Sequence, residues 1–107
     1  MRMAEEIDAN REIRKAVDTG SVSFGEKQAE KNILKGDAQL VIISNNLSKL
    51  LREKISHLAN VSQIPLYEFS GSGMELGAVC GKPFVISTMA IQNIGKSKIL
   101  SYIHKKK

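Results

Sequence analysis

The sequence contains few cysteine and aromatic residues. Its 107 residues include one Cys, no Trp, two Tyr and three Phe. A single cysteine cannot form an internal disulfide, so the fold does not need an oxidising compartment. Cys80 follows Val79 in an apolar stretch, where a lone thiol is usually part of the hydrophobic core. The sequence therefore excludes an internal disulfide framework and gives no sign of a reactive thiol.

Long apolar runs and metal-ligand motifs are also absent. No stretch reaches the ~18 apolar residues of a membrane helix, and residues 1–6 lack the apolar core of a signal peptide. We therefore expect a cytoplasmic protein with no membrane partner. His57 and His104 have no carboxylate or thiol at a spacing that suggests a relay, and no residue pair has metal-ligand spacing. We predict no catalytic residue, no metal and no cofactor.

The composition is that of an ordinary globular domain with excess positive charge. Hydrophobic residues make up 42% and charged residues 25% of the chain. A chain of 107 residues fits one compact domain, so we expect a single domain over 1–107. Sixteen basic and eleven acidic residues give a net charge of +5, which favours a polyanionic partner through counterion release. Charge alone does not identify that partner.

Hydrophobic periodicity predicts alternating helices and strands. Helices are expected over 3–19, 25–36, from 47 to before Pro65, and 72–80; strands are expected over 21–24, 38–44, 64–69 and 84–91. The unbroken run at 40–43 (LVII) suits a central strand covered on both faces. This order predicts an α/β fold, a three-layer sandwich with a partly parallel sheet.

Two glycine-containing segments resemble nucleotide-binding loops. Residues 90–97 (AIQNIGKS) match a phosphate loop if alanine replaces the first glycine, but only ten residues follow, too few for the required helix and strands. Residues 71–77 (GSGMELG) resemble a dinucleotide fingerprint, yet Leu76 occupies the position of the third glycine. A structural alternative is that Ser72 caps a helix and Glu75 completes a capping box. We therefore disfavour a nucleotide-binding enzyme and expect no small-molecule substrate.

The remaining polar groups cluster at the junctions between the predicted strands and helices. These junctions are residues 24–27, 44–46, 72–77 and 82–84. They offer donors for phosphates, amides for base edges, one carboxylate and one aromatic ring. Such groups are the ones with which proteins contact unstacked RNA bases. We therefore expect an RNA-binding surface at one end of the sandwich.

Three collinear segments resemble one ribosomal family. Residues 68–83 read EFSGSGMELGAVCGKP and are similar to a signature of the "L thirty e" family of archaeal and eukaryotic large-subunit proteins. Residues 24–27 (FGEK) with 34–46 (LKGDAQLVIISNN) resemble its first half, and 90–91 with 95–100 (GKSKIL) resemble its ending. The resemblance implies an α/β/α sandwich around a four-stranded mixed sheet and no enzymatic activity. It also implies kinship with the wider "L seven Ae"-like superfamily, which binds kink-turns and related RNA loops.

The resemblance also implies roles for particular loop residues. Gly25 would offer its backbone amide, and Lys27 its charge, to the RNA backbone. Asn45 or Asn46 would approach a base. Glu75 would accept hydrogen bonds from a guanine edge, a kind of contact worth ~1–3 kcal/mol of discrimination.

Three further positions complete this set. Phe84 matches a family aromatic that packs on an exposed base, and its alternative role is a core residue at the start of a strand. Ser72 and Lys82 are polar residues of the same loops. Many relatives have an asparagine immediately before the glutamate, whereas this chain has Met74. A thioether cannot make the hydrogen bonds of an amide, which weakens the expectation of strong, general kink-turn affinity.

The sequence thus predicts a structural component of the large ribosomal subunit. Its expected partners are an internal loop or kink-turn of ribosomal RNA and other large-subunit proteins, and the free protein is expected to be a monomer. The expected location is the ribosome in the cytoplasm. The alternative is a kink-turn-binding protein of small RNA-guided ribonucleoprotein particles.

Overall fold

Helices and strands alternate along the computed structural model, which describes residues 2–99. The elements are α1 (Arg2–Thr19), β1 (Ser21–Phe24), α2 (Glu26–Lys35), β2 (Leu40–Ile43), α3 (Lys49–Val61), β3 (Leu66–Glu68), α4 (Gly73–Val79) and β4 (Thr88–Asn93). The strands form one sheet in the order β1-β4-β2-β3. β4 is antiparallel to both β1 and β2, whereas β2 and β3 are parallel. The predicted four-stranded mixed sheet is therefore confirmed.

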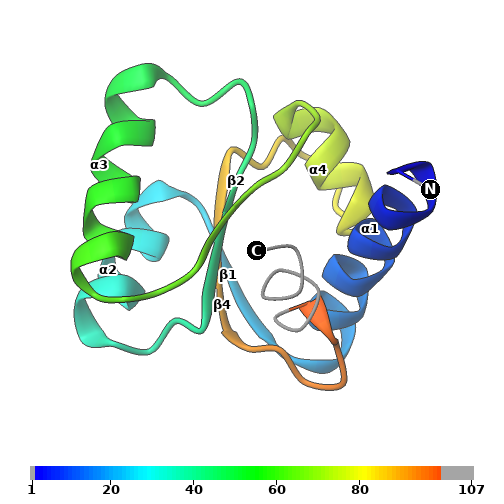
Figure 1. The fold of residues 1–107 in the computed structure, drawn as a ribbon, viewed down its shortest axis with the longest axis horizontal. Helices are drawn as coiled ribbons and strands as arrows, with labels where there is room; N and C mark the ends of the chain where they lie inside the picture. The colour runs from blue at the N-terminus through cyan, green and yellow to red at the C-terminus, as the bar shows by residue number, and fades with distance from the viewer. Residues whose placement is uncertain (1, 100–107) are drawn as a thin grey trace.

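Helices cover both faces of the sheet. α2 and α3 lie on one face, and α1 and α4 lie on the other (Figure 1). The four residues of β2 are fully buried because their side chains alternate between the two faces. Leu40 and Ile42 belong to the core on the side of α1 and α4, and Val41 and Ile43 to the core on the side of α2 and α3. This arrangement confirms the three-layer sandwich and the central position of the β2 strand.

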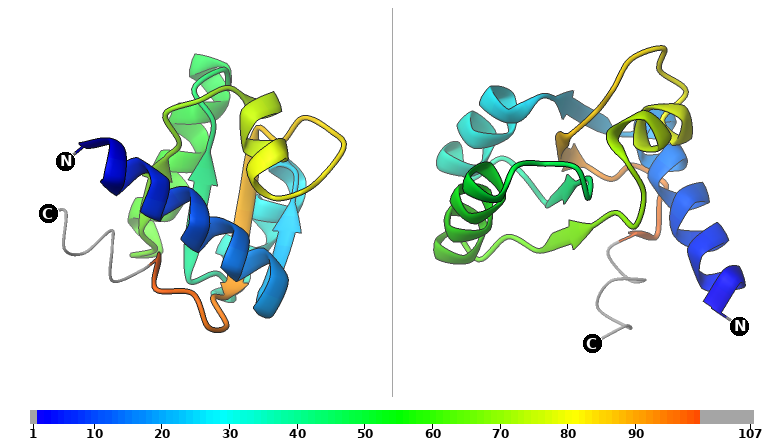
Figure 2. Two further views of the ribbon diagram at one scale, coloured as in Figure 1. Left: turned by 90° about the vertical axis from the view of Figure 1, so that its right-hand side faces the viewer. Right: turned by 90° about the horizontal axis from the view of Figure 1, so that it is seen from above.

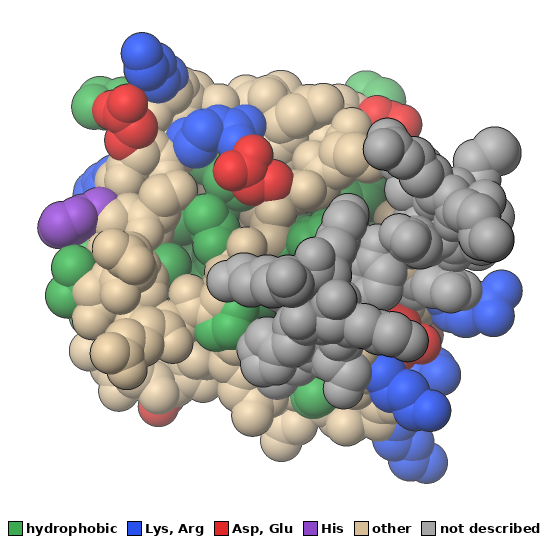
Figure 3. All heavy atoms as spheres, in the orientation of Figure 1, with side chains coloured by type: hydrophobic (Ala, Val, Ile, Leu, Met, Phe, Trp, Pro, Cys, Tyr) green, Lys and Arg blue, Asp and Glu red, His purple; other side chains and the backbone are tan. Residues whose placement is uncertain are grey.

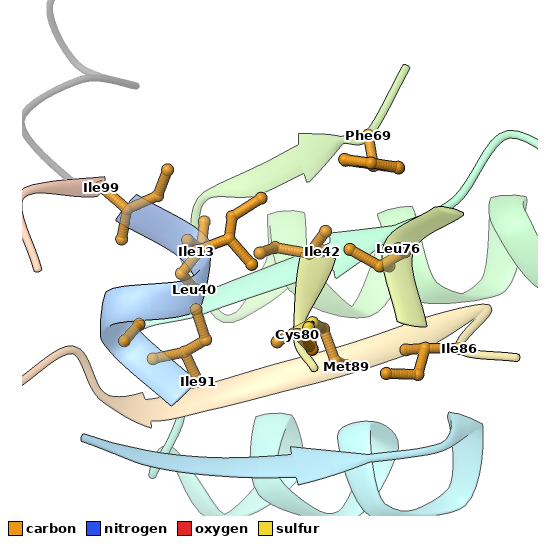
Figure 4. Packing of buried hydrophobic residues seen from close by; sticks show 11 residues of the cluster. Ile13, Leu40, Ile42, Phe69, Leu76, Cys80, Ile86, Met89, Ile91 and Ile99 are labelled. Atoms are coloured by element: carbon orange, nitrogen blue, oxygen red, sulfur yellow. The ribbon is translucent and has the colours of Figure 1, made fainter. Parts of the chain in front are cut away.

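The core between the sheet and the helices α1 and α4 is the larger of the two clusters. Figure 4 shows Ile13 of α1, Leu76 of α4 and Met89 of β4 among its apolar side chains. Cys80 is also buried in this cluster, with its Sγ 3.8 Å from Met89 Sδ. Ile99 reaches the same core after the end of β4. The core position predicted for Cys80 is confirmed.

The last strand begins later than the sequence pattern predicts. β4 starts at Thr88 rather than at residue 84, because residues 84–86 pack on α4 instead of pairing with a strand. The Ile86 amide donates to the Gly73 carbonyl at 2.9 Å, and a Cβ on Gly77 would lie 2.0 Å from the Phe84 carbonyl oxygen. Close packing on α4 therefore holds residues 81–87 in a loop that stands out from the sheet (Figure 2).

The segment that resembles a phosphate loop is a structural corner. Gly95 has a φ of 61°, and a Cβ there would meet the Thr19 backbone at 2.5 Å. The Lys96 amide donates to Thr19 Oγ1 at 3.0 Å, and Ser97 Oγ donates to the Glu12 carbonyl at 2.6 Å. These bonds fasten the corner to α1, so its amides and hydroxyl are engaged within the protein.

Candidate nucleic-acid interface

The sheet topology brings the four polar loops to one edge. β1, β2 and β3 run in the same direction, so their carboxyl ends meet at the edge where the antiparallel β4 begins. The register shows this directly, because Ile43 at the end of β2 pairs with both Thr88 and Glu68. The structure thus places the predicted site residues around one end of the sandwich.

Gly25 and Lys27 lie where β1 leads into α2. Gly25 has φ 103° and ψ 153°, and nothing lies within 4 Å of a Cβ built on it. Its amide donates to the Thr88 carbonyl at 2.8 Å, so this amide is engaged at the sheet edge rather than free for RNA. The open space above Gly25 still permits close approach of a ligand. Lys27 is exposed in the first turn of α2.

A shallow groove runs from Lys27 along α2 towards α3. Its lining includes Glu26, Glu30, Leu34 and Lys54. Glu30 pairs with Lys54, with Oε2 3.1 Å from Nζ. This hydrogen bond and the negative charge of Glu30 raise the pKa of the Lys54 ammonium above its usual range. The Glu30 carboxylate is thereby partnered within the protein.

Two asparagines join the loop after β2 to the loop before α4. The Asn45 amide donates to the Gly71 carbonyl at 3.0 Å, and Asn45 Nδ2 donates to the Ser70 carbonyl at 3.3 Å. Asn46 Oδ1 accepts from the Gly73 amide at 3.2 Å. Both asparagines are exposed despite these contacts. The two loops are therefore fixed relative to one another before any ligand binds.

Arg52 of α3 fastens the ends of β2 and β3 and was not anticipated from the sequence. Its Nη2 donates to the Ser44 carbonyl at 3.2 Å, and its Nη1 lies 2.7 Å from Glu68 Oε1. These partners are 8 and 16 residues away from Arg52. No local spacing rule connects such residues, so only the fold reveals this clamp.

Ser72 and Glu75 form the capping box that the sequence suggested as the structural alternative. The Glu75 amide donates to Ser72 Oγ at 3.3 Å, and the Ser72 amide donates to Glu75 Oε1 at 2.9 Å. Glu75 is nevertheless exposed at the start of α4. Capping engages Oε1, so Oε2 can serve a second role as an acceptor.

Phe84 lies on the surface rather than in the core. Half of this residue is exposed (51%), and its ring packs edge-on against Phe24, with centroids 6.1 Å apart. Lys82 Nζ lies 5.6 Å from the centroid of the Phe24 ring. Because Phe84 precedes the start of β4, the alternative of a core phenylalanine at a strand start is wrong.

Neighbouring apolar side chains extend the surface around Phe84. Met74 is 71% exposed and Val85 54% exposed, and both line a shallow apolar hollow together with Phe84, Pro83 and Lys82. The sequence pattern predicts a strand over residues 84–91, and the exposure of Val85 was therefore not predicted. The Lys82–Pro83 pair before it was the available signal, because proline often marks a turn or loop.

The remaining titratable groups do not suggest catalysis. Burial raises the pKa of the Cys80 thiol to about 11, so it stays protonated at neutral pH. His57 is exposed on α3, and His104 lies outside the described residues. Among residues 9–99, whose side chains the structure describes, no group of three or more His, Cys, Asp or Glu residues could hold a metal ion. Across residues 2–99, no helix has the length and apolarity needed to cross a membrane.

Acidic side chains lie near many of the basic ones on one face of the molecule. On the face shown in Figure 3, basic and acidic side chains are interspersed. On α1, Arg14 pairs with Asp18 at 3.0 Å and Lys15 lies 3.9 Å from Glu12. These pairs place an acidic partner beside two of the basic side chains of α1.

Comparison with proteins of known sequence and structure gives a consistent result. The chain is 48% identical to the large ribosomal subunit protein eL30 of Methanococcus maripaludis over 94% of this chain and 95% of that protein. It is 41% identical to eL30 of Methanocaldococcus jannaschii over 99% and 96% of the two chains, and 42% identical to eL30 of Saccharolobus solfataricus over 92% of each.

A solved structure shares the fold. A protein of unknown function from Bacillus halodurans superposes with a TM-score of 0.71 at 21% identity, covering 92% of this chain and 96% of its own. The model of the ribosomal protein L7Ae/L30e/S12e/Gadd45 family matches residues 7–101. That range contains all four loops of the candidate interface, and this chain belongs to the ribosomal protein L7Ae/L30e/S12e/Gadd45 family.

Proposed function

We propose that this protein is a non-enzymatic structural component of the large ribosomal subunit that binds an internal loop or kink-turn of ribosomal RNA. The observation that carries the proposal is the similarity to eL30 proteins, 41–48% identical over nearly the whole chain. The loop edge supports it, because a preorganised set of polar groups and an exposed ring suits unstacked RNA bases. We also propose that the free protein is a monomer located in the cytoplasm.

The proposed contacts divide into backbone-positioning and base-reading groups. Lys27 and Lys82 neutralise phosphates, and the open α-carbon of Gly25 lets the RNA backbone come close. Ser72 lies at the same edge and orders the first turn of α4 through its cap. These contacts position the RNA and discriminate little between sequences.

The base-reading groups lie beside them. Glu75 accepts hydrogen bonds from a guanine edge, and an asparagine of the 45–46 pair contacts a base. Phe84 stacks on an unpaired base, a contact worth roughly 1–3 kcal/mol. The apolar hollow beside Phe84 adds Val85 and Met74 to the surface that such a base would cover.

Fractionation of a cell extract that contains the tagged chain tests this function. We expect the protein to comigrate with large subunits, and crosslinking of intact subunits should map to one internal loop of the large-subunit RNA. Recovery in small RNA-guided particles would instead support the alternative kink-turn function. Recovery free of RNA in all fractions would contradict both.

A further inference from the structure

Asn46 presents one kind of hydrogen-bonding group to a ligand. Its Oδ1 accepts from the Gly73 amide at 3.2 Å and from the Ser44 hydroxyl at 2.5 Å. A backbone amide can only donate, so the atom that faces Gly73 has to be the oxygen. The Nδ2 group of this exposed side chain, with its two N–H donors, is left for an external partner.

The preceding asparagine has the opposite polarity. Asn45 Nδ2 donates to the Ser70 carbonyl at 3.3 Å, so its side-chain oxygen is the group left over. The two adjacent amides are therefore not interchangeable. Asn46 is arranged as a donor and Asn45 as an acceptor.

Ser44 makes the orientation of Asn46 unambiguous. It is fully buried at the end of β2, and its hydroxyl donates to Asn46 rather than to solvent. The terminal torsion of an asparagine is broad, so a single contact leaves considerable freedom. The Ser44 hydroxyl and the Gly73 amide both donate to Oδ1. These two hydrogen bonds restrict the torsion and keep Nδ2 directed away from the protein.

The Asn46 donor lies beside the Glu75 acceptor. Asn46 Oδ1 accepts a hydrogen bond from the Gly73 amide, and Glu75 Oε1 accepts one from the Ser72 amide. The two side chains therefore bind the backbone amides of adjacent residues at the start of α4. An N–H donor next to a carboxylate complements a base edge in which a keto oxygen adjoins a ring N–H. Guanine has such an edge in its O6 and N1–H.

We propose that Ser44 is a positioning residue that locks Asn46 as a hydrogen-bond donor to the keto oxygen of a bound base. The proposal rests on the proposed function, because it needs an RNA base at this edge. It goes further in fixing which group of Asn46 makes the contact and which residue of the protein interior determines that choice.

Binding to modified RNA tests the proposal. The probe is a kink-turn oligonucleotide in which each loop guanine is replaced in turn by 2-aminopurine, which lacks the O6 acceptor and the N1–H. We expect one replacement to weaken wild-type binding about tenfold, as measured by calorimetry. Ser44→Ala should lower affinity several-fold for the unmodified RNA and reduce the penalty at that same nucleotide.

Asn46→Asp sharpens the test. Aspartate still accepts from Ser44 and Gly73 but turns an acceptor outward, so affinity should fall at least about tenfold and the dependence on that guanine should disappear. Gln28→Glu adds the same charge at an exposed position of α2, next to Lys27 at the loop edge, and measures the electrostatic loss alone. Thermal unfolding of each variant checks that the fold is retained.

The outcomes separate this proposal from the proposed function. If Ser44→Ala keeps the full wild-type dependence on every guanine, Ser44 does not position Asn46, although kink-turn binding itself stands. If Asn46→Asp behaves like Gln28→Glu, the donor assignment is overturned. If the wild-type protein prefers neither the kink-turn nor the internal loop mapped by crosslinking to a regular duplex, both proposals fail.

Discussion

At the scale of single residues, Glu75 combines a structural and a proposed recognition role that one substitution can separate. Glu75→Gln keeps a side-chain acceptor for the Ser72 amide, because glutamine also completes a capping box. It removes the carboxylate charge that would accept from guanine. We expect about tenfold weaker binding to a kink-turn RNA in calorimetry, with unchanged helix content by circular dichroism.

The exposed Glu53 of α3 provides the charge-matched control for this experiment. Glu53→Gln changes the net charge by the same amount, so it reports the effect of charge alone. Equal losses for Glu75→Gln on a kink-turn and on a regular duplex would leave Glu75 with its capping role only.

Lys27 is expected to act on every RNA alike. A lysine that neutralises one phosphate contributes about one unit to the slope of log affinity against log salt concentration. We predict that Lys27→Ala weakens binding to all RNAs and makes that slope shallower by about one. Lys35 lies in the last turn of the same helix and serves as the control, Lys35→Ala. An unchanged slope for Lys27→Ala would refute the phosphate contact.

At the scale of elements, the close approach of α4 to the loop that follows it controls both packing and the position of Phe84. A Cβ on Gly77 would lie 2.0 Å from the Phe84 carbonyl oxygen, which is backbone and cannot rotate away. Alanine favours a helix by ~1 kcal/mol over glycine, but overpacking costs typically about 1–3 kcal/mol. We therefore expect the cost of the steric clash to exceed the gain in helix propensity.

We predict that Gly77→Ala lowers the free energy of unfolding by up to about 2 kcal/mol in urea denaturation and weakens RNA binding by displacing Phe84. The exposed neighbour Ala78 gives the reverse change on the same helix. Ala78→Gly should lose up to ~1 kcal/mol of stability while leaving Phe84 in place. A Gly77→Ala variant more stable than the wild type would show that the loop around Phe84 moves aside without loss of folding free energy.

The elements could largely be predicted, whereas their exact limits depended on tertiary contacts. Local patterns were sufficient to predict α3 from its regular apolar spacing and β2 from its β-branched run. The run from Phe84 to Ile86 looks like the start of a strand, yet its backbone bonds to α4 instead. Nothing in the local pattern reveals that competition.

The candidate site was likewise predictable from local patterns only in part. Its loops were predictable because parallel strands place their carboxyl ends at one edge of a sheet. The polarity of Asn46 was not, because its partner Gly73 lies 27 residues away, and neither was the Arg52 clamp. Sequence patterns located the residues, and only the folded arrangement shows which atoms are already engaged.

At the scale of the whole molecule, the corner at residues 95–97 is built as a link between the end of β4 and α1 and not as a phosphate loop. Its amides bond to side chains and backbone of the protein, so they cannot encircle phosphates. We predict no measurable ATP or GTP binding by calorimetry, with or without magnesium. Lys96→Ala should cause only a modest, salt-sensitive loss of RNA affinity. Magnesium-dependent nucleotide binding that this variant abolishes would contradict the non-enzymatic proposal.

The position of β4 determines when the chain can fold during its own synthesis. Of the strands within residues 2–99, β4 is made last, yet it lies between β1 and β2 and pairs with both. Until Asn93 has emerged, β1 has no neighbouring strand and β2 can pair only with β3. Nascent chains that end before Thr88 should therefore remain protease-sensitive and bind RNA poorly. We therefore expect the native sheet, and with it the loop edge, to form only after β4 has joined β1 and β2.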